Sequence, residues 1–169
     1  MKRHAHDDHR AGSGAAFAWL TVSDTRTPET DTAGQSARRL IEAAGHAIVE
    51  YAIVPDEPQR VRHEVHGWLD DARCRAVVTS GGTGISQRDT TYEALAALLD
   101  KSLDGFGELF RMLSFEQIGS AAMLSRATAG VARGKLLFLL PGSRPAVELA
   151  LERLILPELG HLLAELDRP

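Results

Sequence analysis

The chain has 169 residues, of which 44% are hydrophobic and 25% are charged, and its formal net charge is −4. This length and composition are ordinary for one globular domain that buries a core of its own. The acidic balance argues against a nucleic-acid-binding protein, because no excess of Lys and Arg is available to neutralise phosphates.

The first 14 residues, MKRHAHDDHRAGSG, are polar and lack the apolar stretch of a secretory signal. We expect a flexible arm there, with a metal site at His4, His6 and His9 as the alternative. No apolar run in the chain reaches the ~18 residues that a membrane-spanning helix needs. The single Cys74 excludes an intramolecular disulfide and a CxxC metal site, which is typical of a reducing cytoplasm. We therefore expect residues 15–169 to form one domain of a cytoplasmic protein.

From residue 15 onward, β-type runs alternate with segments of helical periodicity. The runs AAFAWLTVS (15–23), HAIVEYAIV (46–54) and RAVVTS (75–80) predict strands. Each is followed by a segment with apolar residues on one helical face, and Thr32 with Gln35 predicts a capping box at the start of the first helix. Three consecutive strand–helix units indicate a parallel sheet with helices on both faces.

The second half of the chain is less regular. Residues 105–127 predict short helices, and residues 127–142 predict two β runs joined by the tight turn ARGK. A hairpin forces one strand to run against the others, so we expect an α/β fold with a mixed, mostly parallel, five-stranded sheet. A final helix follows PGSRP, and Pro157 predicts a kink or a restart within it.

Ligands of open α/β sheets bind beyond the carboxyl ends of the parallel strands. The loops expected there contain VSDTRTPETD, VPDEP, TSGGTGISQRDTT and LPGSRP. In the third of these, Gly81, Gly82 and Gly84 permit positive φ, so that several N–H groups can converge on an anion, and Ser80 and Thr83 add hydroxyl groups. We favour an anion site there over a plain strand–helix turn. The loop lacks the GxxxxGK[ST] of a Walker loop, and no GxGxxG follows the first strand, which sets aside a dinucleotide oxidoreductase.

Two carboxylates accompany these loops. Beside a phosphate site, Asp89 is better explained by a Mg²⁺ ion carried in with a nucleotide than by complementing a helix start, although Thr90 and Glu93 predict a capping box there. For Asp56, helix capping and a metal-binding or catalytic role stay open. Asp24 and Asp31 in the first loop are equally ambiguous, and Arg26 would be a phosphate partner if that loop folds over the site. The last loop offers a second anion site at Gly142 and Ser143.

The segments SGGTGISQRDTTYEAL, GFGELFRMLSFEQIG, AMLSRATAGV and LPGS together resemble the MoaB/MogA family of molybdenum cofactor biosynthesis proteins, which has related domains in gephyrin. The resemblance runs from about residue 16 to residue 163. It implies a three-layer α/β/α fold, a homotrimer or hexamer, and binding of molybdopterin. In the active branch it also implies transfer of AMP from Mg-ATP to the molybdopterin phosphate, with release of pyrophosphate.

The resemblance also implies roles for individual residues. Asp56 and Asp89 match acidic positions of the active branch and would bind Mg²⁺ or orient the reacting groups. Ligand contacts would come from the first loop, the glycine loop, the LSR segment and the last loop, at Ser23, Asp24, Ser80, Gly81, Gly82, Thr83, Gly84, Ser125, Arg126, Pro141, Gly142 and Ser143. Because some MoaB-type proteins lack the acidic residue at the position of Asp56, the alternative is a non-catalytic molybdopterin carrier or scaffold that serves other enzymes of the pathway. Use of tungsten in place of molybdenum is left open.

Overall fold

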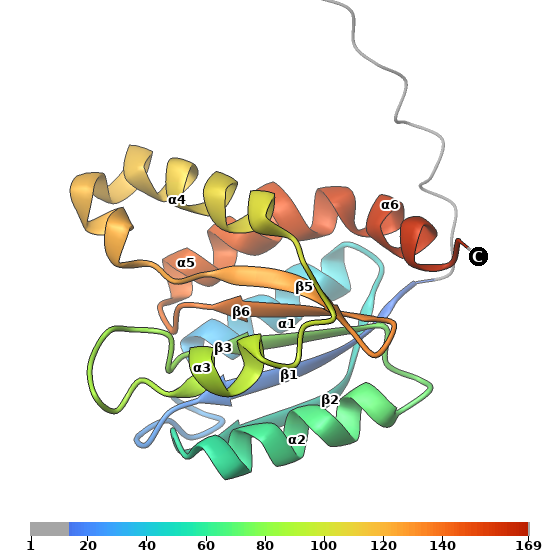
Figure 1. Ribbon diagram of the computed structural model, residues 1–169, viewed down its shortest axis with the longest axis horizontal. Helices are drawn as coiled ribbons and strands as arrows, with labels where there is room; N and C mark the ends of the chain where they lie inside the picture. The colour runs from blue at the N-terminus through green and yellow to red at the C-terminus, as the bar shows by residue number, and fades with distance from the viewer. Residues whose placement is uncertain (1–13, 169) are drawn as a thin grey trace, which may run out of the picture.

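The computed structural model describes residues 14–168, which are built around a six-stranded sheet of order β2-β1-β3-β6-β5-β4 (Figure 1). The strands β1, β2, β3 and β6 run parallel, whereas β5 is antiparallel to β6, and β4 is antiparallel to β5. Their bounds are β1 Ala16–Val22, β2 Ala47–Val54, β3 Ala76–Ser80, β4 Lys101–Ser102, β5 Thr128–Ala132 and β6 Lys135–Leu140.

The predicted mixed, mostly parallel sheet between helical layers is confirmed, but its strand count of five was wrong. The sixth strand is β4, which has two residues, and both are exposed. A strand this short has no apolar alternation that could reveal it in the sequence. Of the segment predicted as a flexible arm, only Gly14 lies within the described residues.

Helices cover both faces of the sheet (Figure 1). One face packs on α2 (Pro58–Asp70) and α3 (Thr91–Ala96) through Ala18, Leu20, Val77, Leu137 and Leu139. The alternate residues of the same strands, among them Trp19, Val78 and Phe138, face the other helices. These are α1 (Thr32–Ala43), α4 (Asp104–Ile118), the 3₁₀ segment η2 (Gly119–Leu124), α5 (Arg144–Ala150), the π-helical segment η3 (Leu151–Ile155) and α6 (Leu156–Leu166).

Helix α1 begins one residue earlier than its predicted capping box. Asp31 is the N-cap, and its Oδ1 accepts a hydrogen bond from the Gly34 N–H at 3.0 Å. At the other end Gly45 has φ +84°, and the His46 N–H donates to the Ile41 carbonyl at 3.1 Å. This is the left-handed glycine ending that closes many helices.

The helical backbone is unbroken around Pro157, but its hydrogen-bond pattern changes there. The Leu156 N–H donates to Leu151 in the wider π-helical pattern, and α6 then starts afresh with Pro157 in its first turn, as predicted for a restart. The ARGK turn is also confirmed, since Arg133 (φ 49°) and Gly134 (φ 73°) join β5 to β6 in the positive-φ conformation of a two-residue hairpin. No helix within residues 14–168 is long and apolar enough to cross a membrane.

Candidate functional site

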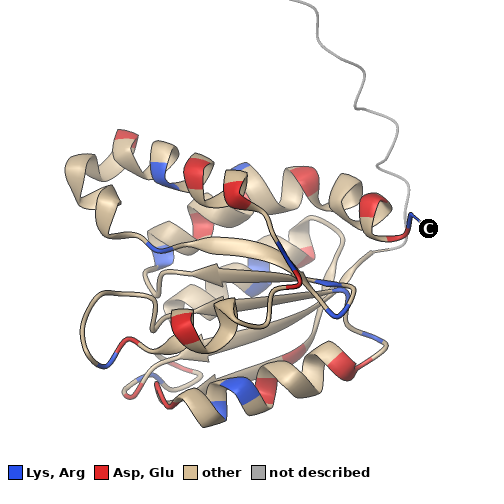
Figure 2. Cartoon of the chain, viewed as in Figure 1, with Lys and Arg blue, Asp and Glu red and all other residues tan. Residues whose placement is uncertain are grey.

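Four loops meet at the carboxyl edge of the parallel strands, on the left of Figure 1. They follow β1, β2, β3 and β6 and comprise residues 23–31, 55–57, 81–90 and 141–143. We call residues 81–84 the glycine loop. Figure 2 shows both acidic and basic residues on the loops at this edge.

The first two glycines of the glycine loop are required by its backbone. Gly81 has φ +106°, and a Cβ there would lie 2.2 Å from the Val22 carbonyl oxygen. Gly82 has φ +64°, and its Cβ would lie 2.2 Å from Thr91 Oγ1 and 2.5 Å from Asp56 Oδ2. The chain therefore turns inside a space that no other residue type fits, which a plain strand–helix turn does not demand.

This turn leaves amide groups available for an anion. Within residues 14–168, no acceptor is hydrogen-bonded to the N–H of Gly82 or Thr83, although Thr83 is only 4% exposed. The same holds for the N–H groups of Gly142 and Ser143 in the last loop. The two loops touch, because a Cβ on Gly142 would lie 3.2 Å from Gly81 Cα. Unbonded amides from both loops can therefore share one anionic ligand.

Asp56 lies beside Gly82 of the glycine loop and is bonded to the start of α3. Its Oδ1 accepts hydrogen bonds from Thr90 Oγ1 at 2.8 Å, Thr90 N–H at 3.3 Å and Thr91 Oγ1 at 3.4 Å. Its Oδ2 faces Gly82 and takes no hydrogen bond from the described residues. Of the two sequence alternatives, Asp56 does not cap the helix that follows it, because Glu57 is the N-cap of α2. One carboxylate oxygen is thus held by α3 and the other remains open to the site.

Asp89 lies beside Gly84, at the other end of the glycine loop from Gly81. Its Oδ2 accepts hydrogen bonds from Ser86 N–H at 2.9 Å and Ser86 Oγ at 2.5 Å. A Cβ on Gly84 would lie 2.6 Å from the same oxygen. The Ser86 hydroxyl, followed by the backbone N–H groups of Ser86 and Gly84, holds the pKa of Asp89 below its ordinary value. The carboxylate is therefore charged at neutral pH and fastened to the loop that it follows.

The first loop is fastened to the third by an ion pair. Asp24 Oδ2 lies 2.5 Å from Arg88 Nη2, and both side chains are exposed. Ser23 stays within its own loop, where its Oγ accepts from the Arg26 N–H at 3.2 Å. Arg26 itself donates to the Thr30 carbonyl at 2.8 Å, so its guanidinium is bonded within the loop. Asp24 is thus the candidate of this loop that lies beside residues 81–90.

Asp31 belongs to the core. It is 1% exposed and accepts hydrogen bonds from Thr21 Oγ1 at 2.6 Å and from the Tyr51 hydroxyl. Burial, and then the bond to Asp31, raises the pKa of Tyr51 far above its ordinary value, so the phenol remains a donor. Of the two ambiguous aspartates of the first loop, Asp31 is structural.

The candidate serines are engaged by neighbouring backbone. Ser80 Oγ donates to the Pro141 carbonyl at 3.2 Å, which fastens the last loop to the glycine loop. Ser143 is the N-cap of α5 and accepts from the Ala146 N–H at 3.4 Å. Ser125 Oγ accepts from the Ala127 N–H at 3.4 Å. These hydroxyls shape the loops, and the backbone amides are the groups left for a ligand.

Arg126 reaches the glycine loop from the η2–β5 junction. Its Nε donates to the Thr83 carbonyl at 2.8 Å and its Nη2 to the Gly84 carbonyl at 2.6 Å. The guanidinium also pairs with Glu93 and lies 4.7 Å over the Tyr92 ring. Glu93 is thus bound to Arg126, and Thr90 makes no side-chain cap, contrary to the predicted capping box. The sequence did not reveal Tyr92 and Glu93 as partners of Arg126, because Arg126 is remote from them in the chain.

The acidic residues of this edge suit a metal that arrives with its substrate. Among the described residues, no group of three or more His, Cys, Asp or Glu side chains could hold a metal ion. Mg²⁺, however, is commonly bound by one or two carboxylates together with substrate phosphates and water. Asp56 beside Gly82 and Asp89 beside Gly84 fit that mode.

The chain has relatives among known proteins. A probable molybdopterin binding domain matches residues 18–161. The molybdenum cofactor biosynthesis protein B of Halalkalibacterium halodurans is 54% identical over 152 residues, which cover 87% of each chain. That of Bacillus subtilis is 51% identical over 150 residues, which cover 88% of each chain.

Solved structures share the whole fold. A crystal structure of a molybdenum cofactor biosynthesis protein B has a TM-score of 0.90 at 49% identity and covers 92% of this chain and 98% of that chain. The tungsten cofactor synthesizing protein MoaB from Pyrococcus furiosus has a TM-score of 0.84 at 37% identity, with 94% and 100% covered. A MogA structure has a TM-score of 0.80 at 30% identity, with 90% and 99% covered.

Proposed function

The chain belongs to the molybdopterin-binding family of molybdenum cofactor biosynthesis proteins, and from this premise we propose that it adenylylates molybdopterin. In this reaction, an oxygen of the molybdopterin phosphate attacks the α-phosphorus of ATP. The bond from that phosphorus to the oxygen bridging it to the β-phosphate breaks, and pyrophosphate leaves. Adenylyl-molybdopterin is the product.

The observation that carries this proposal is the pair of touching loops with unbonded amides. Two phosphorus centres must be held close together while negative charge moves onto pyrophosphate. The N–H groups of Gly82, Thr83, Gly142 and Ser143 have no protein acceptor among the described residues and belong to two loops in contact, which supports their use as donors to phosphate oxygens. Preorganised donors of this kind are a large source of catalysis in phosphoryl-transfer chemistry.

Asp56 and Asp89 would hold Mg²⁺, which supplies charge neutralisation for the phosphates when it is bound. The open Oδ2 of Asp56 is the better-placed oxygen, because its other oxygen is fastened to α3. Asp89 would also shape the loop, because it is hydrogen-bonded to Ser86. Substituting each with Asn removes the charge and keeps a carbonyl oxygen that accepts hydrogen bonds.

The decisive experiment incubates the purified protein with molybdopterin, ATP and Mg²⁺ and measures adenylyl-molybdopterin and pyrophosphate. We expect product from the wild type, and about 100-fold or more loss of turnover in Asp56→Asn and Asp89→Asn with little loss of molybdopterin binding. Asp70→Asn is the control, because Asp70 pairs with Arg133 remote from the site. Tight molybdopterin binding without product would support the carrier alternative, and unchanged rates in the two variants would refute their assignment.

We also propose self-association, at a surface that we call the α4–η2 patch. Its large apolar side chains are between 47% and 80% exposed. Figure 2 shows charged residues along α4 and none on η2. A cavity of about 440 Å³ lies among them. The patch comprises Leu109, Met112, Phe115, Ile118, Met123 and Leu124. An exposed apolar surface of this kind marks an interaction site more often than a solvated face.

Sedimentation tests the expected trimer or hexamer. Phe115→Glu places a charge in the middle of the patch and should give monomers, whereas Ile85→Glu is the control because Ile85 is 73% exposed outside the patch. A wild type that sediments as a monomer would refute self-association. We propose the cytoplasm as the location, because the one cysteine allows no intramolecular disulfide.

A further inference from the structure

Arg126 was expected to contact the ligand, but its guanidinium faces the protein. Its side chain is 26% exposed. Nε and Nη2 donate to the carbonyls of Thr83 and Gly84, and Nη1 and Nη2 also donate to the Glu93 carboxylate. Four of the five N–H donors of a guanidinium are thereby engaged. One N–H remains, which makes Arg126 a poor ligand for phosphate.

These contacts fix the orientation of two consecutive peptide units. In a planar trans peptide, the carbonyl of one residue and the N–H of the next point in opposite directions. Because the carbonyls of Thr83 and Gly84 point toward Arg126, the N–H groups of Gly84 and Ile85 point away from it. The Gly84 N–H then faces Asp89 and contributes to the low pKa of that carboxyl group.

We propose that Arg126 is a positioning residue, which holds the glycine loop in its anion-binding shape and sets Asp89 beside it. The role requires a rigid fork: two adjacent donors reach two successive carbonyls, while the opposite edge is held by Glu93 and the flat face by Tyr92. A lysine ammonium keeps the charge but cannot span these acceptors in the same way. The proposal rests on the proposed function only in taking the anion to be a phosphate.

The test compares Arg126→Lys with the wild type by two measurements. The first is hydrogen exchange of the Gly84 and Ser86 amides, whose N–H groups face Asp89, and the second is pyrophosphate binding by titration calorimetry. We expect exchange in the loop to become about tenfold faster and the Kd for pyrophosphate to rise about tenfold, as for the loss of a charge-assisted hydrogen bond. Arg62→Lys is the matched control, because Arg62 Nε also donates to a backbone carbonyl, that of Ala94, but outside the loop.

Glu93→Gln is a second variant in case Arg126→Lys does not fold. Its side chain is 61% exposed, so the fold should tolerate the change, while Arg126 loses its charged partner. We expect a smaller change of the same sign, about threefold in both measurements. Weaker pyrophosphate binding with unchanged loop exchange would show that Arg126 contacts the anion itself and would overturn the proposal. Unchanged values in Arg126→Lys would overturn it as well.

The exchange measurement separates this inference from the proposed function. If the wild type neither binds pyrophosphate nor forms adenylyl-molybdopterin, the proposed function fails. Faster exchange in Arg126→Lys would still support Arg126 as the residue that holds the loop. Conversely, an active enzyme whose loop exchange does not depend on Arg126 keeps its function and loses this inference.

Discussion

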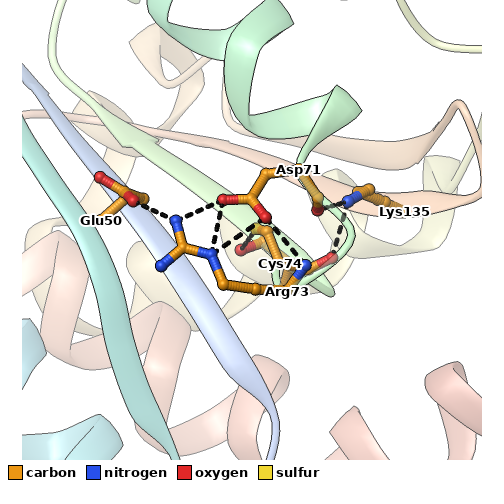
Figure 3. Close-up of polar contacts among 6 residues, drawn as sticks. Glu50, Asp71, Arg73, Cys74 and Lys135 are labelled. Atoms are coloured by element: carbon orange, nitrogen blue, oxygen red, sulfur yellow. Dashed lines mark hydrogen bonds and ion pairs between the residues drawn. The ribbon is translucent and has the colours of Figure 1, made fainter.

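The two edges of the sheet differ in whether their polar groups are paired within the protein. At the amino edge, Figure 3 shows Arg73 between Asp71 and Glu50, with Nη2···O distances of 2.6 Å and 2.5 Å. Nearby, the Lys135 ammonium donates to the backbone carbonyls of Asp71 and Cys74, the latter at 2.8 Å. At the carboxyl edge, by contrast, backbone N–H groups of two loops have no protein acceptor among the described residues.

This difference separates a structural corner from a binding site. The amino edge uses charged side chains to satisfy the carbonyls where α2 ends, and burial raises the pKa of the Cys74 thiol, which keeps it unreactive. At the carboxyl edge, one oxygen of Asp56, the Asp89 carboxylate and the Arg126 guanidinium are hydrogen-bonded to the loops. The second oxygen of Asp56 and several backbone N–H groups have no protein partner among the described residues, so they are available to a ligand.

The largest effect should come from Gly82→Ala. A methyl group at Gly82 meets Thr91 Oγ1 and Asp56 Oδ2 at a positive φ, so we expect a cost of about 3 kcal/mol in the free energy of unfolding. Pyrophosphate binding should weaken by about 100-fold or more, because the loop must move. Urea unfolding and titration calorimetry measure the two effects.

Gly134→Ala is the matched control for that experiment. Gly134 also has positive φ, +73°, but a Cβ there meets nothing within 4 Å. We expect a cost of about 1 kcal/mol from the left-handed backbone alone, with pyrophosphate binding unchanged. Equal effects on binding in the two variants would mean that the glycine loop has no special relation to the anion.

A smaller effect, confined to stability, is expected from Lys135→Met. Methionine retains the apolar stem and removes both hydrogen bonds to the end of α2. We expect a loss of about 1–2 kcal/mol in the free energy of unfolding. Adenylyl transfer and pyrophosphate binding should be those of the wild type, and a loss of binding would contradict the separation of the two edges.

The smallest effect is a pH dependence of stability at the amino edge. Half-buried His46 accepts a hydrogen bond from the Ala15 N–H at 3.1 Å, and desolvation holds its pKa below the ordinary 6.5. As the pH falls through 6.5, the unfolded chain takes up a proton before the folded one does, so stability decreases. We expect the melting temperature to fall by a few degrees between pH 7.5 and pH 5.5, and by less in His46→Gln. An equal fall in both would assign the effect to other groups.

Much of the fold could be predicted because its signals are local. The strand–helix alternation, the ARGK hairpin and the glycine loop each depend on residues within a few positions of one another. Thr90 is the N-cap residue of α3, but the side-chain bonds predicted there do not form, and Thr32 is not the N-cap of α1. The reason is the opposite one, since the deciding contacts are remote in sequence. Asp31 is the N-cap of α1 and also accepts hydrogen bonds from Thr21 and Tyr51 in the core. Glu93 forms an ion pair with Arg126 and not a capping bond.

The sequence by itself therefore determined the α/β architecture, the family and the loop at which to look for an anion. Its periodicity reports how each segment buries its own apolar residues, and its glycines report where the backbone must turn. Only the tertiary structure decided which polar groups are hydrogen-bonded within the protein and which stay available for a ligand. The bond from Ser80 to Pro141 joins residues 61 positions apart, and it lies beside the contact of Gly142 with Gly81. The bond from Arg126 to Thr83 joins residues 43 positions apart. Such contacts depend on how the strands are ordered in the sheet, which leaves no periodic trace in the chain.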